Sequence, residues 1–255
     1  MPIRHVGAIL INGRAAAYRD HMNFKSNLNH LGPVSSRSTV GDTVYRALRD
    51  ALTVGRFDPS QVLTISAMSQ AFQTSHMPVR EALRRLTTEG ALEVGSSGSA
   101  RVPAVDRKRL DDIIEARVLL ERKATILAAT LVTEEAVNEL ARLARIHSEV
   151  ANHRDAHDML LKNRDFHFAI YRASGSLVLP SLIETLWLQY GPYMRMLSDQ
   201  LTKKWRDGDH EPYAIGHMKI VEALRDHDAD RAADEVEADI RRTQNQLQAA
   251  LPRGF

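Results

Sequence analysis

The sequence of 255 residues contains no cysteine, which excludes disulfide bonds and thiolate metal sites. Aromatic residues make up only 5% of the chain, although the hydrophobic fraction of 44% is sufficient for a packed core. No apolar run reaches about 18 residues, the length that crosses a bilayer, so we expect no transmembrane helix and no membrane partner. These absences fit a protein of the reducing cytoplasm.

The formal net charge is only +2, but it is unevenly distributed along the chain. Residues 1–36 carry a net charge of +3, residues 37–105 a net charge of +2, and residues 106–255 a net charge of −3. Positive charge therefore lies in the N-terminal part, and this is the sign that a DNA backbone attracts.

Residues 1–36 show no clear helical or strand period. The apolar stretch Val6–Ile11 is short and is interrupted by Asn12, Gly13 and Arg14, so a signal peptide is not favoured. The Asn, Ser, Gly and Pro residues from Asn23 to Ser38 indicate a flexible arm, and Met22 is an alternative start.

The stretch Thr74–Glu89 has the pattern of a helix that follows a tight polar turn. Pro78 is acceptable in the first helical turn and Ser75 is a suitable N-cap, so the helix is expected to begin near His76. Together with the helical pattern of Ile65–Phe72 before the turn, this predicts a helix-turn-helix. The apolar face, at i, i+3, i+4, i+7 spacing, consists of Val79, Ala82, Leu83 and Leu86. The opposite, basic face carries His76, Met77, Arg80, Arg84 and Arg85.

Further elements are predicted on both sides of this motif. After Gly90, an Ala-Leu-Glu-Val segment, a Gly/Ser run and an Ala-Arg-Val-Pro segment indicate strand, turn and strand, which is the wing of a winged helix. Upstream, Thr43–Val54 has the pattern of an amphipathic helix that ends at Gly55 and the following Asp-Pro turn.

This order of elements closely resembles the winged-helix domain of GntR-type bacterial transcription regulators over residues 37–103, most specifically in "PVREAL" followed by "L..EG". The resemblance implies a homodimer on a double-stranded DNA operator. Where the family usually has Arg-Thr, this chain has His76-Met77, so His76 offers a weaker, protonation-dependent contact. A solvated or ion-paired face is the alternative for Arg80. The expected operator contacts are Ser75, His76, Met77, Arg80, Arg84, Gly98 and Arg101.

From Asp106 onward the sequence changes to long helical periods, with Pro103 at the junction. No strand pattern interrupts them, so an all-helical antiparallel bundle is predicted, with Pro192 kinking the fourth helix. Helices are expected at about residues 106–131, 133–152, 155–174, 177–200, 211–227 and 229–250.

Three segments of this half resemble the FCD ligand-sensing domain of one large GntR subfamily. They are "IIEARVLLERKATILAA" (113–129), "NRDFHFAIYRASGS" (163–176) and "GHMKIVEALRDHDADRAADEVEADI" (216–240). Six helices, in place of seven, resemble the VanR-like branch more than the FadR-like one. The expected fold is therefore mainly α. A flexible arm (1–36) and a winged helix-turn-helix domain (37–103) precede a helical effector-binding and dimerisation domain (106–252).

Four polar residues of the helical half are expected to converge because of their spacing. Asn163 and His167 are i, i+4 partners on one side of the third helix. His217 and Asp239 each lie 11 residues from Asp228, in the turn between two antiparallel helices, so they should lie at the same height. If the third helix packs on that hairpin, one carbonyl oxygen, two imidazoles and one carboxylate meet. This set suits zinc, nickel or manganese.

The resemblance implies the same location for a metal site. The family uses Asp-x-x-x-His on the third helix and one His on each of the last two helices. His167 and His217 match, whereas Asn163 replaces the Asp and Asp239 replaces the final His, which leaves one anionic ligand. The alternative is that these four residues hydrogen-bond to one another and to water in a ligand cavity.

Arg117 matches an arginine that faces the cavity in the family. Its guanidinium could grip the carboxylate of a small organic acid or sugar acid in bidentate fashion. The competing interpretation is an ion pair with Glu121, four residues later, or with Glu115. The other histidines of this half are expected at the surface: His147, His153, His157 and His227.

The sequence therefore predicts a transcription regulator, with repression the expected mode, whose operator affinity is controlled by such an acid, with a divalent metal as the candidate cofactor. One alternative is a metal-dependent enzyme fused to a DNA-binding module. It lacks support, because there is no Cys, no Ser in a Gly-x-Ser-x-Gly elbow and no second carboxylate placed as a general base beside the proposed site. A second alternative is a DNA-binding protein without an effector, whose bundle serves only dimerisation.

Overall fold

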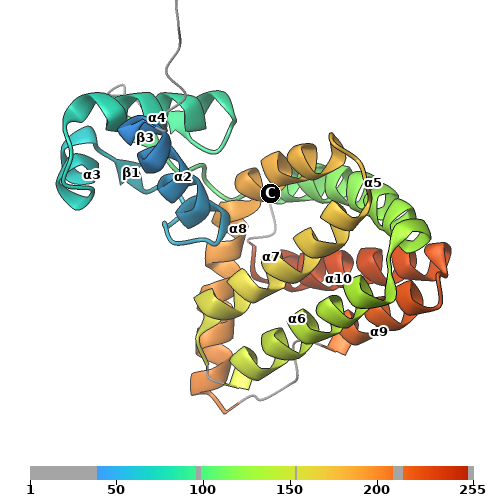
Figure 1. Cartoon of the computed structure of the whole chain (residues 1–255). Coiled ribbons are helices and arrows are strands. Elements are labelled where there is room, and N and C mark those ends of the chain that lie inside the picture. Colours follow the sequence, from blue (N-terminus) through green and yellow to red (C-terminus); the bar gives the residue numbers. More distant parts are fainter. Residues whose placement is uncertain (1–38, 96–98, 153, 209–214, 252–255) are drawn as a thin grey trace, which may run out of the picture. The chain divides into compact units, whose positions relative to one another are not determined.

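The structure is a computed structural model that describes residues 39–95, 99–152, 154–208 and 215–251 (Figure 1). The chain divides into two units, residues 1–38 and 39–255, and every described residue belongs to the second. The arm expected at residues 1–36 and the wing residue Gly98 lie outside the described part. That part is mainly helical, as predicted, with a helix-turn-helix and a small sheet followed by a helical bundle.

The N-terminal part contains the helix-turn-helix and one strand more than expected. Its sheet is antiparallel with the order β1-β3-β2, and Val62 pairs with Arg101, which in turn pairs with Glu93. The Gly/Ser turn between β2 and β3 revealed those two strands, whereas no turn joins β1 to its partner β3, and for this reason β1 was missed. The elements are α2 (Val40–Thr53), β1 (Val62–Leu63), α3 (Ile65–Ala71), α4 (His76–Thr88), β2 (Glu93–Val94) and β3 (Ala100–Arg101).

Helix α4 begins at the predicted residue and buries the predicted face. The four apolar residues Val79, Ala82, Leu83 and Leu86 are all buried in the core of this part. Ser75 occupies the predicted N-cap position, although its side chain makes no capping hydrogen bond. By contrast, Thr39 forms a complete capping box with Asp42 at the start of α2.

Within the described residues, the bundle contains the six helices that were expected. The largest difference concerns α8, which continues past Pro192 and past residue 200 to Arg206. It ends at Asp207-Gly208, where Gly208 has φ +87°. None of the described helices is long and apolar enough to cross a membrane. The helices are α5 (Arg107–Leu131), α6 (Glu134–Asn152), α7 (Ala156–Ala173), α8 (Leu179–Arg206), α9 (Ile215–Arg225) and α10 (Ala229–Ala250).

Helix α8 contributes to two hydrophobic cores. Trp187 is buried in the core of the bundle, whereas the next residue, Leu188, is buried in the core formed by α2, α4 and the sheet. The following residue, Gln189, donates a hydrogen bond through Nε2 to the carbonyl oxygen of Glu89, at 3.0 Å. Successive side chains of a helix point about 100° apart, so one helix can serve both cores.

We expect Leu86→Ala to lower the free energy of unfolding by about 2–5 kcal/mol, because Leu86 is fully buried and the surrounding side chains cannot close the cavity. The measurement is chemical denaturation followed by circular dichroism. Met77→Ala is the matched control on the same helix, since Met77 is 70% exposed and should change stability by about 0.5 kcal/mol or less. Equal losses in the two variants would contradict the burial of this face.

Candidate functional site

The predicted DNA-facing residues of α4 are accessible. Ser75, His76, Met77, Arg80 and Arg84 are all exposed. Neither Arg80 nor Arg84 forms an ion pair with any residue that the structure describes. These two guanidinium groups are therefore available to an external anion.

Two other arginines of this part are already engaged. Arg85 pairs with Asp42 at 2.9 Å and lies 3.8 Å over the ring of Tyr45, so it is less available to an external anion than Arg80 and Arg84. Arg101, on β3, pairs with Glu93 of the neighbouring strand at 2.7 Å. An operator phosphate would have to compete with Glu93 for Arg101.

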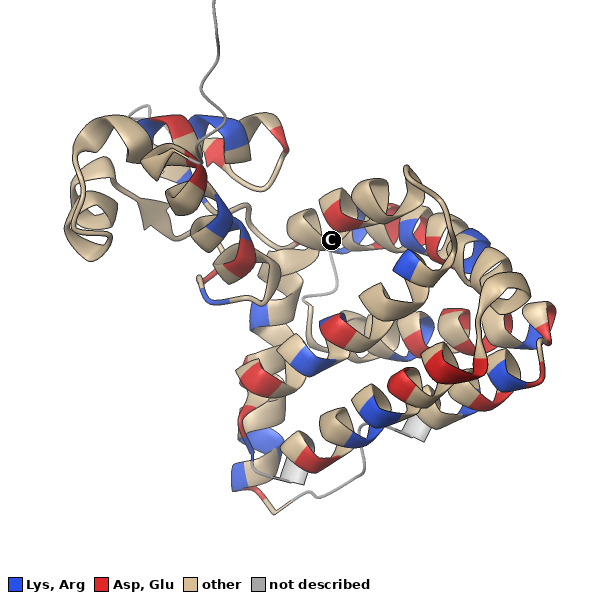
Figure 2. Ribbon diagram, viewed as in Figure 1, with Lys and Arg blue, Asp and Glu red and all other residues tan. Residues whose placement is uncertain are grey.

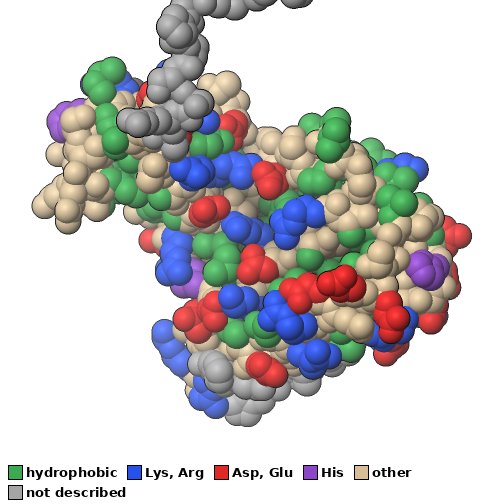
Figure 3. All heavy atoms as spheres, viewed as in Figure 1, with side chains coloured by type: hydrophobic (Ala, Val, Ile, Leu, Met, Phe, Trp, Pro, Cys, Tyr) green, Lys and Arg blue, Asp and Glu red, His purple; other side chains and the backbone are tan. Residues whose placement is uncertain are grey.

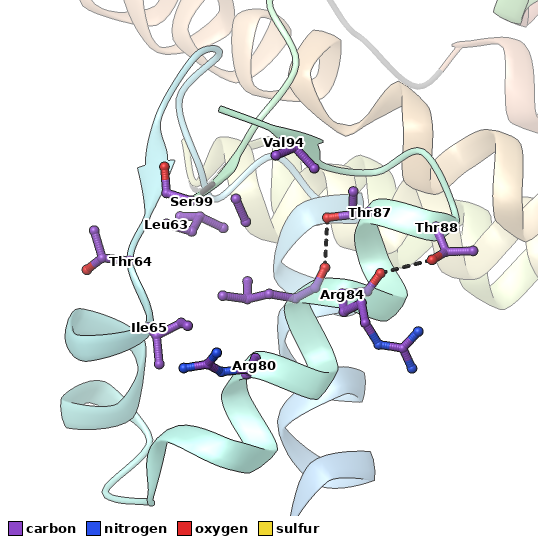
Figure 4. A pocket seen from close by; sticks show the side chains of 11 residues that line it. Leu63, Thr64, Ile65, Arg80, Arg84, Thr87, Thr88, Val94 and Ser99 are labelled. Atoms are coloured by element: carbon purple, nitrogen blue, oxygen red, sulfur yellow. Dashed lines mark hydrogen bonds between the residues drawn. The ribbon is translucent and has the colours of Figure 1, made fainter. Parts of the chain in front are cut away.

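A hollow of about 490 Å³ lies between α4, the start of α3 and the sheet. Figure 4 shows the Arg80 side chain extending from α4 toward Ile65 at the edge of this hollow. The hydroxyls of Thr87 and Thr88 donate to carbonyl oxygens of their own helix, those of Leu83 and Arg84. The hollow is therefore mostly apolar, with Arg80 as a charged group on its rim.

Both parts carry charges of both signs, but α4 has an excess of positive charge. Figure 2 shows basic positions and an acidic one along α4, and a mixture of both signs on the helices of the bundle. Helix α4 contains Arg80, Arg84 and Arg85 against the single acid Glu81. On the face seen in Figure 3, acidic and basic side chains alternate over the bundle without a large patch of one sign. Among the described elements in these views, α4 is therefore the clearest candidate for a nucleic-acid contact.

Inside the bundle, His167 of α7, His217 of α9 and Asp239 of α10 come together. One ligand atom from each lies within 4.8 Å of the others. Nε2 of His167 is 3.2 Å, and Nε2 of His217 is 3.9 Å, from the same oxygen, Oδ2 of Asp239. Asn163 lines the same cavity. Thus all four residues that were expected to converge surround one space.

The two oxygens of Asp239 have different surroundings. Oδ1 accepts a hydrogen bond from Arg242 at 2.8 Å, while Oδ2 faces the two histidines. Burial alone would raise the pKa of Asp239, but its contacts with His167, His217 and Arg242 hold that pKa well below its ordinary value. Gly216 permits the close approach of α9, because a Cβ there would lie 2.9 Å from Oδ1 of Asp239.

His147 belongs to this cluster, although the sequence interpretation placed it at the surface. It is only 1% exposed, and its Nδ1 lies 3.1 Å from Nδ1 of His217. Burial lowers the pKa of His147 to about 4 and holds the pKa of His217 well below its usual value. Both rings are therefore neutral near neutral pH, the state in which an imidazole can ligate a metal. His227 is exposed, as expected.

Arg117 is buried and paired with Glu121, one of the two partners considered from the sequence. Its Nε lies 2.7 Å from Oε1 of Glu121, and its Nη2 lies 3.3 Å from Oε2. The guanidinium also lies 4.4 Å from the ring centroid of Trp187. Although burial disfavours the charged form, the attraction of Glu121 raises the pKa of Arg117, so the pair is ionic.

The carboxylate of Glu121 receives two further hydrogen bonds. Trp187 donates Nε1–H to Oε1 at 2.9 Å, and the Tyr171 hydroxyl donates to Oε2. Oη of Tyr171 also lies 3.2 Å from Nδ1 of His167. Burial and the nearby carboxylate raise the pKa of Tyr171 well above its ordinary value, so the hydroxyl keeps its proton. A continuous chain of contacts therefore joins Asp239 to Arg117.

The cavity between these side chains has a volume of about 20 Å³, which is enough for one water molecule or one ion but not for an organic acid. The nearby donors are two imidazole nitrogens, a carboxylate oxygen and the amide of Asn163, which is a set that divalent transition metals accept. In size and chemistry, these residues fit a single divalent cation.

Three residues of this network were missed, or identified only in part, from the sequence. His147 carries no local signal, because its partner His217 lies 70 residues away in the sequence. Tyr171 could have been found from its i, i+4 spacing to His167, but its bond to Glu121, 50 residues away, could not. The i, i+4 spacing revealed Glu121 as a partner of Arg117, but not its bonds to α7 and α8.

We expect Glu121→Leu to lower the free energy of unfolding by about 3–5 kcal/mol, because it leaves the buried Arg117 guanidinium without a counter-charge. The double variant Arg117→Met/Glu121→Leu should recover most of this loss. Glu139→Ala removes an exposed i, i+3 partner of Arg142 and should cost about 0.5 kcal/mol or less. Denaturation curves measure all three values, and a double variant no more stable than Glu121→Leu would contradict the argument.

Comparison with known proteins agrees with both halves of the structure. Residues 41–102 match the model of the bacterial regulatory proteins of the gntR family, and residues 112–242 match the FCD domain. The chain is 32% identical over 154 residues to the HTH-type transcriptional regulator McbR of Escherichia coli (strain K12), covering 60% of this chain and 70% of that protein. It is 24% identical over 196 residues to the gluconate operon transcriptional repressor of Bacillus subtilis (strain 168), covering 76% and 79%.

The similarity extends to solved structures. The structure of E. coli McbR/YncC superposes with a TM-score of 0.77 at 26% identity, covering 84% of this chain and 99% of that one. A Rhodococcus GntR protein has the same fold, with a TM-score of 0.67 at 20% identity, covering 82% of this chain and 98% of that one. The chain therefore belongs to the GntR family of bacterial transcription regulators and carries an FCD domain.

Proposed function

We propose that this regulator is a homodimeric repressor of the VanR-like FCD branch. Its operator affinity is controlled by a small organic acid or sugar acid, which binds through a divalent metal. The observation that carries the effector half is the convergence of His167, His217 and Asp239 on one cavity within the FCD match. The six described helices of the bundle are consistent with the VanR-like branch.

The DNA half of the proposal rests on α4. Two copies of this helix in a dimer would enter successive major grooves, so the operator should be pseudo-palindromic, with one α4 per half-site. The exposed Arg80 and Arg84 supply unpaired positive charge, and His76 lies in the first turn of the helix. Arg80 is the candidate for a contact with a guanine edge.

We expect Arg80→Ala to weaken binding to the cognate operator by about 1–3 kcal/mol, because it removes a bidentate contact with a base. The operator is first selected from random duplex DNA with the parent protein, and affinities are then measured by fluorescence anisotropy at one salt concentration. Arg142→Ala removes the same charge from an exposed position of the bundle and should leave the affinity unchanged. If operator binding weakened equally in both variants, the effect of Arg80 would come from overall charge and not from a contact with a base.

The metal half of the proposal assigns each donor. Nε2 of His167, Nε2 of His217 and Oδ2 of Asp239 would hold the ion, with the Asn163 amide as a weaker fourth ligand. When bound, the cation supplies a Lewis acid and a positive charge to which an effector carboxylate can bind. A homologue named for repression of a gluconate operon makes sugar acids the first class of effector to test.

The charges of the cavity support an effector that binds after the metal. Arg117 is neutralised by Glu121, and Asp239 is neutralised by Arg242. Without a metal, the cavity therefore offers no uncompensated positive charge to an acid. Arg117 can bind an effector carboxylate only if its guanidinium contacts that carboxylate and Glu121 at the same time. Because the cavity is small, an acid would bind more tightly to a bundle conformation in which the cavity is larger. The difference in affinity between the two conformations would shift the bundle toward the larger cavity and thereby move the winged helices.

We expect Asn163→Asp to bind zinc, nickel or manganese about one order of magnitude more tightly than the parent, because a carboxylate adds a second anionic ligand. His217→Ala should lose most of the metal, as measured by elemental analysis and titration calorimetry. Asn138→Asp makes the same change at an exposed position of α6 and should not alter affinity. Metal-free parent protein that still releases operator in the presence of an acid would refute the metal role while keeping the pocket.

A further inference from the structure

We infer that Glu121, acting through Tyr171, is a positioning residue that keeps a proton on Nδ1 of His167 and leaves Nε2 free as a ligand. This inference rests on the proposed metal site and deepens it. Glu121 does not line the metal cavity. It lies on α5 and reaches His167 only through the Tyr171 hydroxyl of α7.

The direction of the hydrogen bonds carries the argument. The Glu121 carboxylate only accepts, and Arg117 and Trp187 already donate to it, so the Tyr171 proton points to Oε2 of Glu121. A hydroxyl has one proton, so toward His167 the Tyr171 oxygen can only accept. The contact of 3.2 Å between that oxygen and Nδ1 of His167 is then a hydrogen bond donated by Nδ1–H.

This tautomer determines what the other ring nitrogen can do. With a proton on Nδ1, the neutral ring has a lone pair on Nε2, and Nε2 lies 3.2 Å from the Asp239 oxygen Oδ2. A lone pair and a carboxylate oxygen repel each other unless a cation lies between them. The relay from Glu121 therefore prepares His167 Nε2 and Asp239 Oδ2 to share a metal ion.

Two substitutions should break the relay at different points. Tyr171→Phe removes the acceptor for Nδ1–H, so the neutral ring should move its proton to Nε2 and donate it to Asp239. Glu121→Gln keeps the shape of the side chain. Its carbonyl oxygen should stay at the Oε1 position, which receives both Arg117 Nε–H and Trp187 Nε1–H, so its NH₂ group faces Tyr171. The NH₂ group would then donate to the Tyr171 oxygen, and the Tyr171 proton would turn to His167.

The test combines metal affinity with a direct reading of the tautomer. Zinc is titrated into the full-length metal-free parent, Tyr171→Phe and Glu121→Gln by competition with a chelator dye. The protonated nitrogen of His167 is identified from ¹⁵N chemical shifts of selectively labelled protein, at a pH where the ring is neutral. Both variants should bind zinc about 10–100-fold more weakly than the parent and carry the His167 proton on Nε2. Tyr193→Phe is the matched control, because it removes a buried tyrosine hydroxyl that donates to Asp106 at the start of α5.

The outcomes separate this inference from the proposed function. A proton on Nε2 of His167 in the parent, or parent-like zinc affinity in both folded variants, would overturn the relay while leaving the metal site intact. If Tyr193→Phe weakened zinc binding as much as the other two variants, general destabilisation would explain the loss. This result would also overturn the relay. A parent that binds no zinc, nickel or manganese overturns the metal site, whereas the ¹⁵N measurement still decides where the proton lies.

Discussion

The buried carboxylate of Glu121 is the group on which the interior of the bundle depends. It receives four hydrogen bonds, two from Arg117 of its own helix, one from Tyr171 of α7 and one from Trp187 of α8. An ionised carboxylate with no solvent exposure is stable only if its desolvation is offset by a counter-charge and by donors to its lone pairs. Three helices are therefore fixed relative to one another by one group. The same group determines the orientation of the side chains that reach the cavity.

The donor from α8 connects this network to the DNA-binding part. Trp187 binds Glu121, whereas the next residue, Leu188, is buried with α2 and α4 in the other core. A rigid helix that contributes to two cores transmits a displacement of one side chain to the other core, because packed interiors do not deform freely. A ligand that changes the packing around Trp187 therefore acts on the helix that also packs against the winged helix. This coupling requires only that the ligand favour one arrangement of α8 over another.

Sequence periodicity predicted the features that depend on local geometry. It failed for residues whose surroundings are set by segments that are distant in the sequence. The helices of the bundle follow from their 3.6-residue period, and the convergence of His217 and Asp239 follows from equal spacing about Asp228. His147 was assigned to the surface because nothing near it in the sequence shows that α6 packs on α9. The end of α8 was placed too early, since its last turns are polar although Leu201 is buried. Tertiary contacts decided each of these cases.

Tertiary contacts also decide how much positive charge is available. A count of arginines in the sequence overstates the positive charge that is accessible to DNA. In the N-terminal part, Arg85 is held by Asp42, Arg101 by Glu93, and Arg49 lies against both Glu89 and Glu184. An arginine engaged by a carboxylate contributes little to the release of counterions from a phosphate backbone. Among the described arginines of the N-terminal part, Arg80 and Arg84 of α4 remain exposed and form no ion pair. Recognition by the described surface must then depend on how α4 fits the groove more than on net charge.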